Sequence, residues 1–176
     1  LEGNIGSGKS TFLKLLKEKF KGKNVIFLDE PVSEWISIEY NNSNILELFY
    51  NDKDKYSFTF QVLAYITRLR MLLDVLKKNS DNIIICERSI YTDKFVFAKM
   101  LYDQGHISEI EWKTYNYWFD TFKNETKLDY IIYVNTFPEL CLERIKKRSR
   151  SGESNITLNY LNDCNQNHLD WINNTN

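Results

Sequence analysis

The residues best suited to chemistry stand at the start of the chain, where a glycine-rich segment ends in lysine and serine. Residues 3–10 have the sequence GNIGSGKS, which satisfies the pattern G-x-x-x-x-G-K-[ST]. The glycines of such a loop let backbone N–H groups surround phosphates, while Lys9 would reach the β- and γ-phosphates and Ser10 would offer its hydroxyl to Mg²⁺. The expected phosphate-binding residues are Gly3, Asn4, Ile5, Gly6, Ser7, Gly8, Lys9, Ser10 and Thr11.

Charged residues follow two short apolar runs of the chain. Glu30 comes after the run 25–28, and Glu87 and Arg88 come directly after the run 83–86. If both runs are parallel strands, these side chains gather at the carboxyl ends of the strands, where such sheets bind their ligands. A carboxylate there could take the proton of an attacking hydroxyl group. A turn-capping Glu30 and a structural ion pair of Glu87 with Arg88 are the alternatives.

Apolar runs alternate with helical patterns, and this alternation predicts the fold class. The runs 25–28, 83–86 and 130–134 are continuous, as expected of strands covered on both faces. Helical spacing covers 9–20, 57–78, 91–102, 108–122 and 138–148. We therefore predict an α/β fold of the P-loop NTPase type, with a doubly wound parallel sheet flanked by helices.

Six motifs follow one another in a fixed order. They are residues 3–11, Glu30-Pro31-Val32 with Trp35, Tyr50, residues 57–61 (SFTFQ), Glu87-Arg88-Ser89 with Tyr91 and Asp93, and residues 144–150 (RIKKRSR). In these motifs the whole chain resembles the deoxynucleoside kinase family. The resemblance implies that ATP or another nucleoside triphosphate phosphorylates the 5′-hydroxyl of a deoxynucleoside in nucleotide salvage. It also implies that Glu30 is the general base, that Arg88 and Lys9 contact the transferring phosphoryl group, and that Glu87 joins Ser10 in holding Mg²⁺.

The resemblance also implies a pocket for the deoxynucleoside. Gln61 would bind the edge of the base, and Tyr50 and Glu153 would bind the sugar 3′-hydroxyl. Gln61 lies on one face of a predicted helix with residues 64 and 68, although a solvated glutamine and plain core aromatic residues are the alternatives. The implied substrate-binding residues are Glu30, Trp35, Tyr50, Phe60, Gln61, Ala64, Arg68, Arg88, Asp93, Phe97 and Glu153.

Asp93 and Arg68 also suggest which base is preferred. Asp93 could accept a hydrogen bond from an exocyclic amino group, and Arg68 could brace that carboxylate or donate to a ring acceptor. Thymine would present a carbonyl and a methyl group at the same edge. We therefore expect deoxycytidine or purine deoxynucleosides to be preferred over thymidine.

A basic cluster near the C-terminus completes the motifs. Arg144 and Arg148 are four residues apart on a predicted helix, and Arg150 follows in a polar loop. The resemblance implies that they form an arginine-rich lid over the donor phosphates, because guanidinium groups stay charged and hold phosphate oxygens well. Favourable charge at a helix C-terminus is the alternative. Gly152 and Thr157 depart from the family, in which an acid and a proline, respectively, are common at these positions. These two departures leave the mobility of the lid open.

Length and charge set the remaining limits. The 176 residues fit one domain, 1–176, and the formal net charge of −1 provides no field for holding a nucleic-acid polymer. No apolar run is long enough to span a membrane, and three cysteines without C-x-x-C spacing are typical of a reduced cytoplasmic protein. We expect truncation of the first strand and of a C-terminal strand and helix, which would leave an organellar leader unreadable. The resemblance implies a homodimer.

Two other functions stay open. A thymidylate-type kinase acting on nucleoside monophosphates would share the loop and the sheet, but it would need extra cationic residues beside its acceptor. The segment 50–68 offers mainly aromatic and amide groups there. A catalytically inactive nucleotide-binding module would usually have lost Lys9, Glu30 or a lid arginine, and the sequence retains them all.

Overall fold

A short parallel sheet stands beside the helices in the computed structural model, which describes residues 1–78 and 82–175. Strands β1 (Val25–Leu28) and β4 (Ile83–Cys86) pair in parallel, with Leu28 opposite Cys86. The first residues of the chain lie along the other edge of β4, since the Arg88 amide donates to the Leu1 carbonyl over 3.0 Å. The predicted α/β class with parallel strands is confirmed. Residues 79–81 and 176 of the predicted domain lie outside the described residues.

The third predicted strand, 130–134, is wrong as a strand. This segment forms only an isolated parallel bridge between Glu2 and Tyr133. The Glu2 amide donates to the Ile132 carbonyl, and the Glu2 carbonyl accepts from the Val134 amide, both over 2.8 Å. A ladder requires several consecutive partners, and beyond Glu2 the glycine loop turns away, so the pairing does not extend along the segment.

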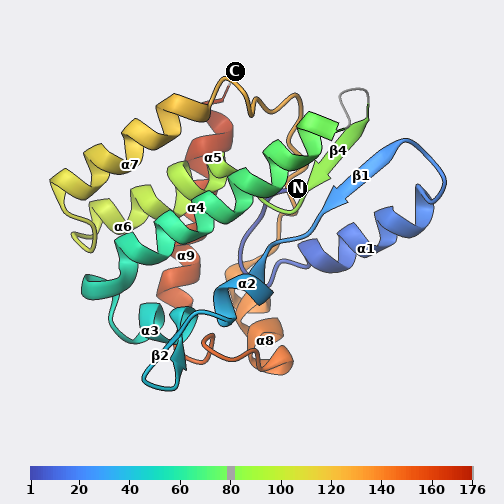
Figure 1. Cartoon of the computed structure of the whole chain (residues 1–176). Coiled ribbons are helices and arrows are strands. Elements are labelled where there is room, and N and C mark those ends of the chain that lie inside the picture. The colour runs from blue at the N-terminus through green and yellow to red at the C-terminus, as the bar shows by residue number, and fades with distance from the viewer. Residues whose placement is uncertain (79–81, 176) are drawn as a thin grey trace.

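Helices make up most of the described chain, and a small hairpin of β2 (Glu39–Tyr40) and β3 (Ser43–Asn44) lies among them. Figure 1 shows α1 beside the β1–β4 pair, while α6 and α7 lie away from it and the long helix α4 runs between them and the strands, with its C-terminal end next to β4. Among the described residues, no helix has both the length and the apolar character needed to cross a membrane. The helices are α1 (Lys9–Lys19), α2 (Val32–Ile36), α3 (Ile45–Asn51), α4 (Lys53–Lys78), α5 (Ile90–Thr92), the π-helix η1 (Asp93–Ala98), α6 (Lys99–Asp103), α7 (Glu109–Phe122), α8 (Pro138–Arg148) and α9 (Leu158–Asn173).

The predicted helices 9–20, 108–122 and 138–148 are confirmed as α1, α7 and α8. The helix expected at 57–78 begins earlier, at Lys53, and the one expected at 91–102 contains the π-helix η1, a distortion that is common at functional sites. Helix α9 was not predicted. It occupies the Asn-rich end of the chain and buries one face, including Leu161, Cys164 and Trp171.

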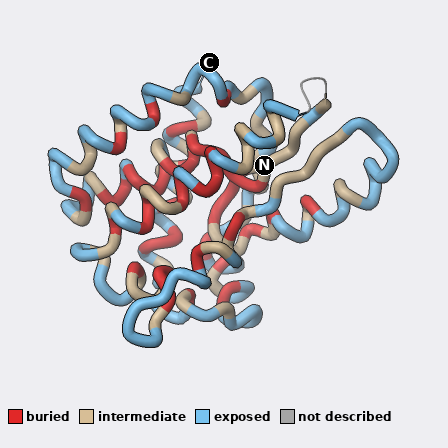
Figure 2. Tube along the Cα trace, in the orientation of Figure 1, coloured by how far each residue is buried: buried red, intermediate tan, exposed pale blue. Residues whose placement is uncertain are grey.

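The core lies where these helices meet. Figure 2 shows buried residues gathered along the facing sides of the helices, while the outer turns and loops are exposed. The π-helix η1 packs against α4 and α9, so its buried residues link the long central helix to the C-terminal one. Burial of this apolar surface supplies the main favourable free energy for positioning Asp93 and Phe97, which η1 carries.

Candidate active site

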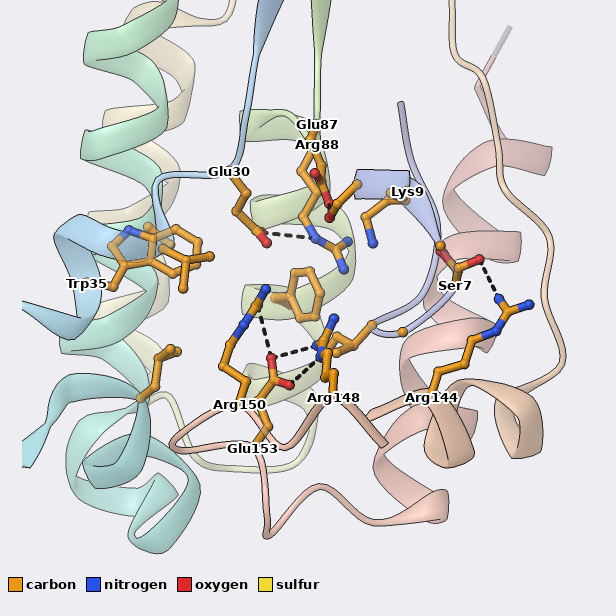
Figure 3. A pocket seen from close by; sticks show the side chains of 18 of the residues that line it. Ser7, Lys9, Glu30, Trp35, Glu87, Arg88, Arg144, Arg148, Arg150 and Glu153 are labelled. Carbon is orange, nitrogen blue, oxygen red and sulfur yellow. Dashed lines mark hydrogen bonds and ion pairs between the residues drawn. The ribbon is translucent and has the colours of Figure 1, made fainter. Parts of the chain in front are cut away.

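A cleft of about 770 Å³ opens at the carboxyl ends of β1 and β4. Figure 3 shows Lys9, Glu30 and Arg88 on one side of it and Arg148, Arg150 and Glu153 on the opposite side. Gly3 and Asn4 belong to the glycine loop without lining the cleft. The other predicted site residues line it, namely Ile5, Gly6, Ser7, Gly8, Lys9, Ser10, Thr11, Glu30, Trp35, Tyr50, Phe60, Gln61, Ala64, Arg68, Glu87, Arg88, Asp93, Phe97, Arg144, Arg148, Arg150 and Glu153.

The glycine loop is packed tightly between α8 and α9. Gly6 has a φ of +78°, and a Cβ atom there would lie 2.5 Å from the Cys141 carbonyl oxygen of α8. Asn4 anchors the other side of the loop, because its side-chain amide donates to the Leu161 carbonyl of α9 over 2.8 Å. The packing therefore fixes the backbone of the loop before any ligand binds.

Lys9 is buried at the base of the loop. Its ammonium group donates to the Asn4 carbonyl over 2.8 Å. Burial and then the Arg88 guanidinium lower the pKa of Lys9 to about 7, although nearby carboxylates oppose that shift. A terminal phosphate would supply the negative charge that favours the protonated form.

Ser10 and Glu87 are oxygen donors at the mouth of the loop. The Ser10 hydroxyl donates to a carboxylate oxygen of Glu87 over 2.9 Å. In the described part of the chain, no group of three or more His, Cys, Asp or Glu side chains could hold a metal ion. This pair nevertheless fits Mg²⁺, which commonly takes one or two protein oxygens and completes its shell with water and substrate phosphates.

Glu30 sits between two guanidinium groups. Its Oε1 atom is 3.2 Å from Nε of Arg88 and 3.3 Å from Nη2 of Arg68. Burial would raise the pKa of Glu30, but Arg88, Arg68 and Lys9 together hold it below its ordinary value. Arg88 reaches this position from a left-handed backbone conformation, with a φ of +65°, directly after β4. Such a conformation in a non-glycine residue costs free energy and is typical of functional sites.

A second carboxylate shares Arg68. Nε of Arg68 donates to Asp93 over 2.9 Å and Nη2 donates to it over 3.1 Å, which is a two-pronged pair. Burial raises the pKa of Asp93, and Arg68 opposes that shift. The Nη1 atom of Arg68 is buried without a hydrogen-bond partner among the described residues. Gln61, which is 2% exposed, lies two turns earlier on the same face of α4 as Arg68. These groups could recognise the polar edge of a base.

Aromatic rings wall the same part of the cleft. Trp35 and Phe60 contact edge to face, with ring centroids 5.4 Å apart, and the Trp35 indole donates to Thr67 of α4 over 2.9 Å. The Arg88 guanidinium lies 4.7 Å from the centroid of Phe97. Because the rings are buried and fixed by these contacts, they form a preformed slot for a flat ligand.

The lid arginines are held in place by two different acceptors. Arg144 donates to the Ser7 carbonyl of the glycine loop over 2.9 Å. Arg148 donates to both oxygens of Glu153, over 2.8 and 2.7 Å, and Arg150 adds a bond of 3.2 Å. The structure thus places Glu153, the expected sugar partner, with the lid. Tyr50 is the other residue expected to bind the sugar 3′-hydroxyl. Its pKa is raised, first because Tyr50 is buried and then because the Glu153 carboxylate is near.

The loop after Arg150 is attached to the start of α3. The Ser151 hydroxyl donates to Glu47, and the Asn44 amide donates to Ser151 over 3.3 Å. Gly152 follows with a φ of +86°, and a Cβ atom there would lie 2.9 Å from Cβ of Leu46. The lid therefore packs closely on the helix that carries Tyr50, and a glycine permits this approach.

Sequence reasoning missed several residues of the cleft. Helix α3 was not predicted, although Asn44 and Glu47 form a capping box before an apolar run, which is a recognisable helix start. Val32 belongs to the Glu30-Pro31-Val32 motif but was not assigned to the cleft, and no comparable signal marked the others, because their approach to the cleft depends on tertiary packing. The additional lining residues are Phe12, Leu15, Val32, Leu46, Phe49 and Tyr160.

Comparison with known proteins settles the family. A family model described as deoxynucleoside kinase matches residues 1–176. The chain belongs to the deoxynucleoside kinase family. It is 37% identical to a probable deoxycytidine kinase of fowlpox virus over 100% of this chain and 72% of that protein. It is 35% identical to a mitochondrial deoxyguanosine kinase of Xenopus laevis and to human deoxycytidine kinase, over 98% of this chain and 71% and 74% of theirs.

Membership in this family confirms the predicted fold and reaction class. The protein is a P-loop phosphotransferase with an alcohol group as acceptor, and it phosphorylates deoxynucleosides with a nucleoside triphosphate as donor. The match over the whole chain favours this activity over the thymidylate-type kinase and the inactive nucleotide-binding module.

Triphosphate binding to this deoxynucleoside kinase is expected to weaken at alkaline pH. Because the pKa of Lys9 is lowered to about 7, its ammonium group loses its proton above that value, whereas bound phosphates favour the protonated form. Binding then takes up a proton, and affinity falls by up to about tenfold per pH unit from about pH 7.5 to about pH 9. Calorimetry with a non-hydrolysable ATP analogue, in buffers of different ionisation enthalpy, measures both effects.

The Lys9→Arg variant is the control for that titration, because arginine stays charged across this range. Its affinity for the analogue should be independent of pH. If the parent enzyme also bound with constant affinity and without proton uptake, Lys9 would not be the titrating group.

The Gly152→Ala substitution should impair the lid of this kinase. Its Cβ atom would meet Leu46 at 2.9 Å in addition to the unfavourable φ, so the lid would be displaced. We expect KM for the triphosphate to rise about tenfold. The matched control is Gly105→Ala, because Gly105 has a φ of +80° with no atom within 4 Å of the new Cβ. Equal effects of both variants on KM would show that the lid contact is unimportant.

Proposed function

We propose that Glu30 is the general base that takes the proton of the deoxynucleoside 5′-hydroxyl. The observation that carries this proposal is the position of its carboxylate, which lies at the carboxyl end of β1, 3.2 Å from Arg88 and in the same cleft as Lys9. A lowered pKa keeps Glu30 ionised at neutral pH and able to accept a hydrogen bond. Phosphoryl transfer needs mainly positioning and charge neutralisation, so a weakly basic carboxylate suffices.

The donor, which we propose to be ATP, would bind through the glycine loop and the lid. The loop amides and Lys9 would hold its phosphates, while Arg88, with Arg144, Arg148 and Arg150 of the lid, would neutralise charge on the transferring group. Ser10 and Glu87 would hold Mg²⁺, supported by the hydrogen bond of 2.9 Å between them. When bound, Mg²⁺ supplies positive charge next to the β- and γ-phosphate oxygens.

The acceptor would lie between the aromatic rings and α4. Gln61 would donate to and accept from the base edge, and Asp93 would accept from an exocyclic amino group while Arg68 holds its carboxylate. We propose a preference for deoxycytidine or purine deoxynucleosides over thymidine. The names of the similar viral and human proteins, a probable deoxycytidine kinase and a deoxycytidine kinase, support this choice.

A homodimer is also part of the proposal. Helices α4 and α7 lie together, since the Tyr65 hydroxyl donates to the Trp118 carbonyl over 3.2 Å. Their outer faces expose Ile66, Ile110 and Tyr117, and Tyr117 is 76% exposed. Exposed large apolar side chains on two neighbouring helices favour association with a second copy. We further propose that the enzyme acts in the cytoplasm, which the free cysteines of the described chain support, and that it has no nucleic-acid polymer as partner.

The Glu30→Gln variant tests the general base. The amide keeps the size of the side chain and removes the basic oxygen, so kcat should fall about 10²- to 10⁴-fold while triphosphate affinity changes little. Steady-state kinetics and fluorescence titration of an ATP analogue measure the two quantities. The matched control is Glu34→Gln, because Glu34 is a surface residue paired with Arg70. Unchanged turnover in the Glu30 variant would mean that another group is the base.

Comparison of turnover on the four deoxynucleosides tests the base pocket. Deoxycytidine or a purine deoxynucleoside should exceed thymidine in kcat/KM by about 10²-fold or more, because a mismatched edge leaves buried polar groups unpaired. The Asp93→Asn variant should reduce this ratio, since its amide can donate to the thymine carbonyl. Thymidine as the best substrate would refute the proposed pocket and leave the kinase activity intact. Thymidine 5′-monophosphate as an additional acceptor tests the thymidylate-type alternative.

A further inference from the structure

A buried histidine that no step of the proposed reaction uses lies behind the cleft. His168 is 0% exposed and belongs to α9, and its Nδ1 atom is 2.7 Å from the Cys164 carbonyl oxygen one helical turn earlier. A carbonyl oxygen can only accept a hydrogen bond, so Nδ1 carries the proton and donates it. In the neutral ring the other nitrogen, Nε2, then presents a lone pair.

The lone pair of His168 is directed at the guanidinium group of Arg88. The Nη1 atom of Arg88 is 3.5 Å from Nε2, at the long end of hydrogen-bonding distance, and such contacts in ligand-free sites often tighten when substrate binds. The ring of Phe97 contacts both partners, since it lies edge-on to the imidazole at a centroid distance of 6.2 Å and 4.7 Å from the guanidinium carbon. The guanidinium therefore has a neutral acceptor on one nitrogen and Glu30 on another.

Protonation of the imidazole would convert this contact into a repulsion between two buried cations. Burial and then the Arg88 guanidinium lower the pKa of His168 to about 3, so the ring is neutral at physiological pH. Lys9 also opposes its protonation, and Tyr133 is the other aromatic ring packed on it, at 5.9 Å. The neutral imidazole thus offers the Arg88 guanidinium an acceptor and adds no second positive charge beside it.

We propose that His168 is a positioning residue for the kinase reaction, which orients the Arg88 guanidinium toward Glu30 and the transferring phosphoryl group through the lone pair of its Nε2 atom. The proposal rests on the role assigned to Arg88 above. Arg88 requires such support because it departs from β4 in a left-handed conformation, with a φ of +65°, and its long side chain must be held at several points to keep one orientation. Phe97 supplies the face of a ring and His168 supplies the directional contact.

A histidine that merely fills the core would produce a different result on substitution. Loss of packing lowers stability, and any loss of activity then follows the fraction of folded enzyme. Loss of orientation at Arg88 lowers kcat in the folded enzyme and leaves KM for both substrates nearly unchanged, because the affected contact is made in the transition state. The separation of kcat from KM and from the melting temperature therefore distinguishes the two roles.

Three variants of the full chain test the proposal. His168→Phe keeps a ring and removes the lone pair, and we expect kcat to fall about tenfold, equivalent to about 1.4 kcal/mol, with each KM within about threefold. His168→Gln keeps an oxygen acceptor at a similar reach and should recover most of that loss. The control is His106→Gln, because His106 is the other histidine of the sequence and pairs with Asp54 at the surface. Melting curves of each variant establish how much enzyme is folded.

A double-mutant cycle with Arg88→Lys provides the decisive comparison. If His168 acts through Arg88, the His168→Phe change should have little further effect on kcat in the Arg88→Lys background. Additive losses, or a His168→Phe enzyme with unchanged kcat, would overturn the positioning role. Full activity of Arg88→Lys would instead refute the role proposed for Arg88 itself, so the two failures are distinguishable. Should His168→Phe fold poorly, His168→Leu, which also removes the lone pair, completes the cycle in both backgrounds, and a loss additive with that of Arg88→Lys contradicts the proposal.

Discussion

The pairing of Glu30 with two arginines is the interaction on which the rest of the site depends. Moving a carboxylate out of water costs several kcal/mol unless opposite charges and hydrogen bonds compensate, and the Glu30 side chain is only 19% exposed. Arg88 and Arg68 both reach the same oxygen, at 3.2 and 3.3 Å. Both guanidinium groups must therefore be held firmly. They are positioned by elements that are far apart in the sequence. The register of β1 and β4 brings one arginine to Glu30, and the long helix α4 brings the other.

The same pairing connects the proposed base pocket with the proposed phosphate site through charged side chains. Arg68 is shared between Glu30 and Asp93, so the guanidinium that holds the proposed base-recognising carboxylate also neutralises the proposed general base. The positive charge of Arg88 also disfavours the protonated form of Lys9. The pKa of Lys9 is lowered first by burial and then by the Arg88 guanidinium. In the described cleft, cationic side chains outnumber carboxylates, and a bound triphosphate would supply the missing negative charge. The site is thus arranged for a highly charged donor and a neutral acceptor.

Local signals in the sequence predicted the parts of the fold that local physics determines. The glycine loop, the strands β1 and β4 and the helices α1, α7 and α8 each carry a short-range pattern, and each is present as predicted. The position of Glu30 opposite Arg88 was also predictable, because the carboxyl ends of parallel strands meet at one edge. Segment 130–134 has the composition of a strand but pairs only through one bridge, since its partner along the sheet is a single residue.

Features that depend on packing between remote segments were not predictable. Nothing in the sequence near Arg144 indicates that it donates to the Ser7 carbonyl, 137 residues away, and nothing near His168 indicates that it faces Arg88, 80 residues away. The π-helix η1, which packs against α4 and α9, likewise has no signature in its local sequence.

A crystal structure of the complex with deoxycytidine and a non-hydrolysable ATP analogue, in which the 5′-hydroxyl keeps its proton, tests the central claim most directly. We predict that a carboxylate oxygen of Glu30 lies about 2.6–3.2 Å from that 5′-oxygen while its contact with Arg88 is kept. A Glu30 side chain directed away from that 5′-hydroxyl, with another acid or base in its place, would contradict the account.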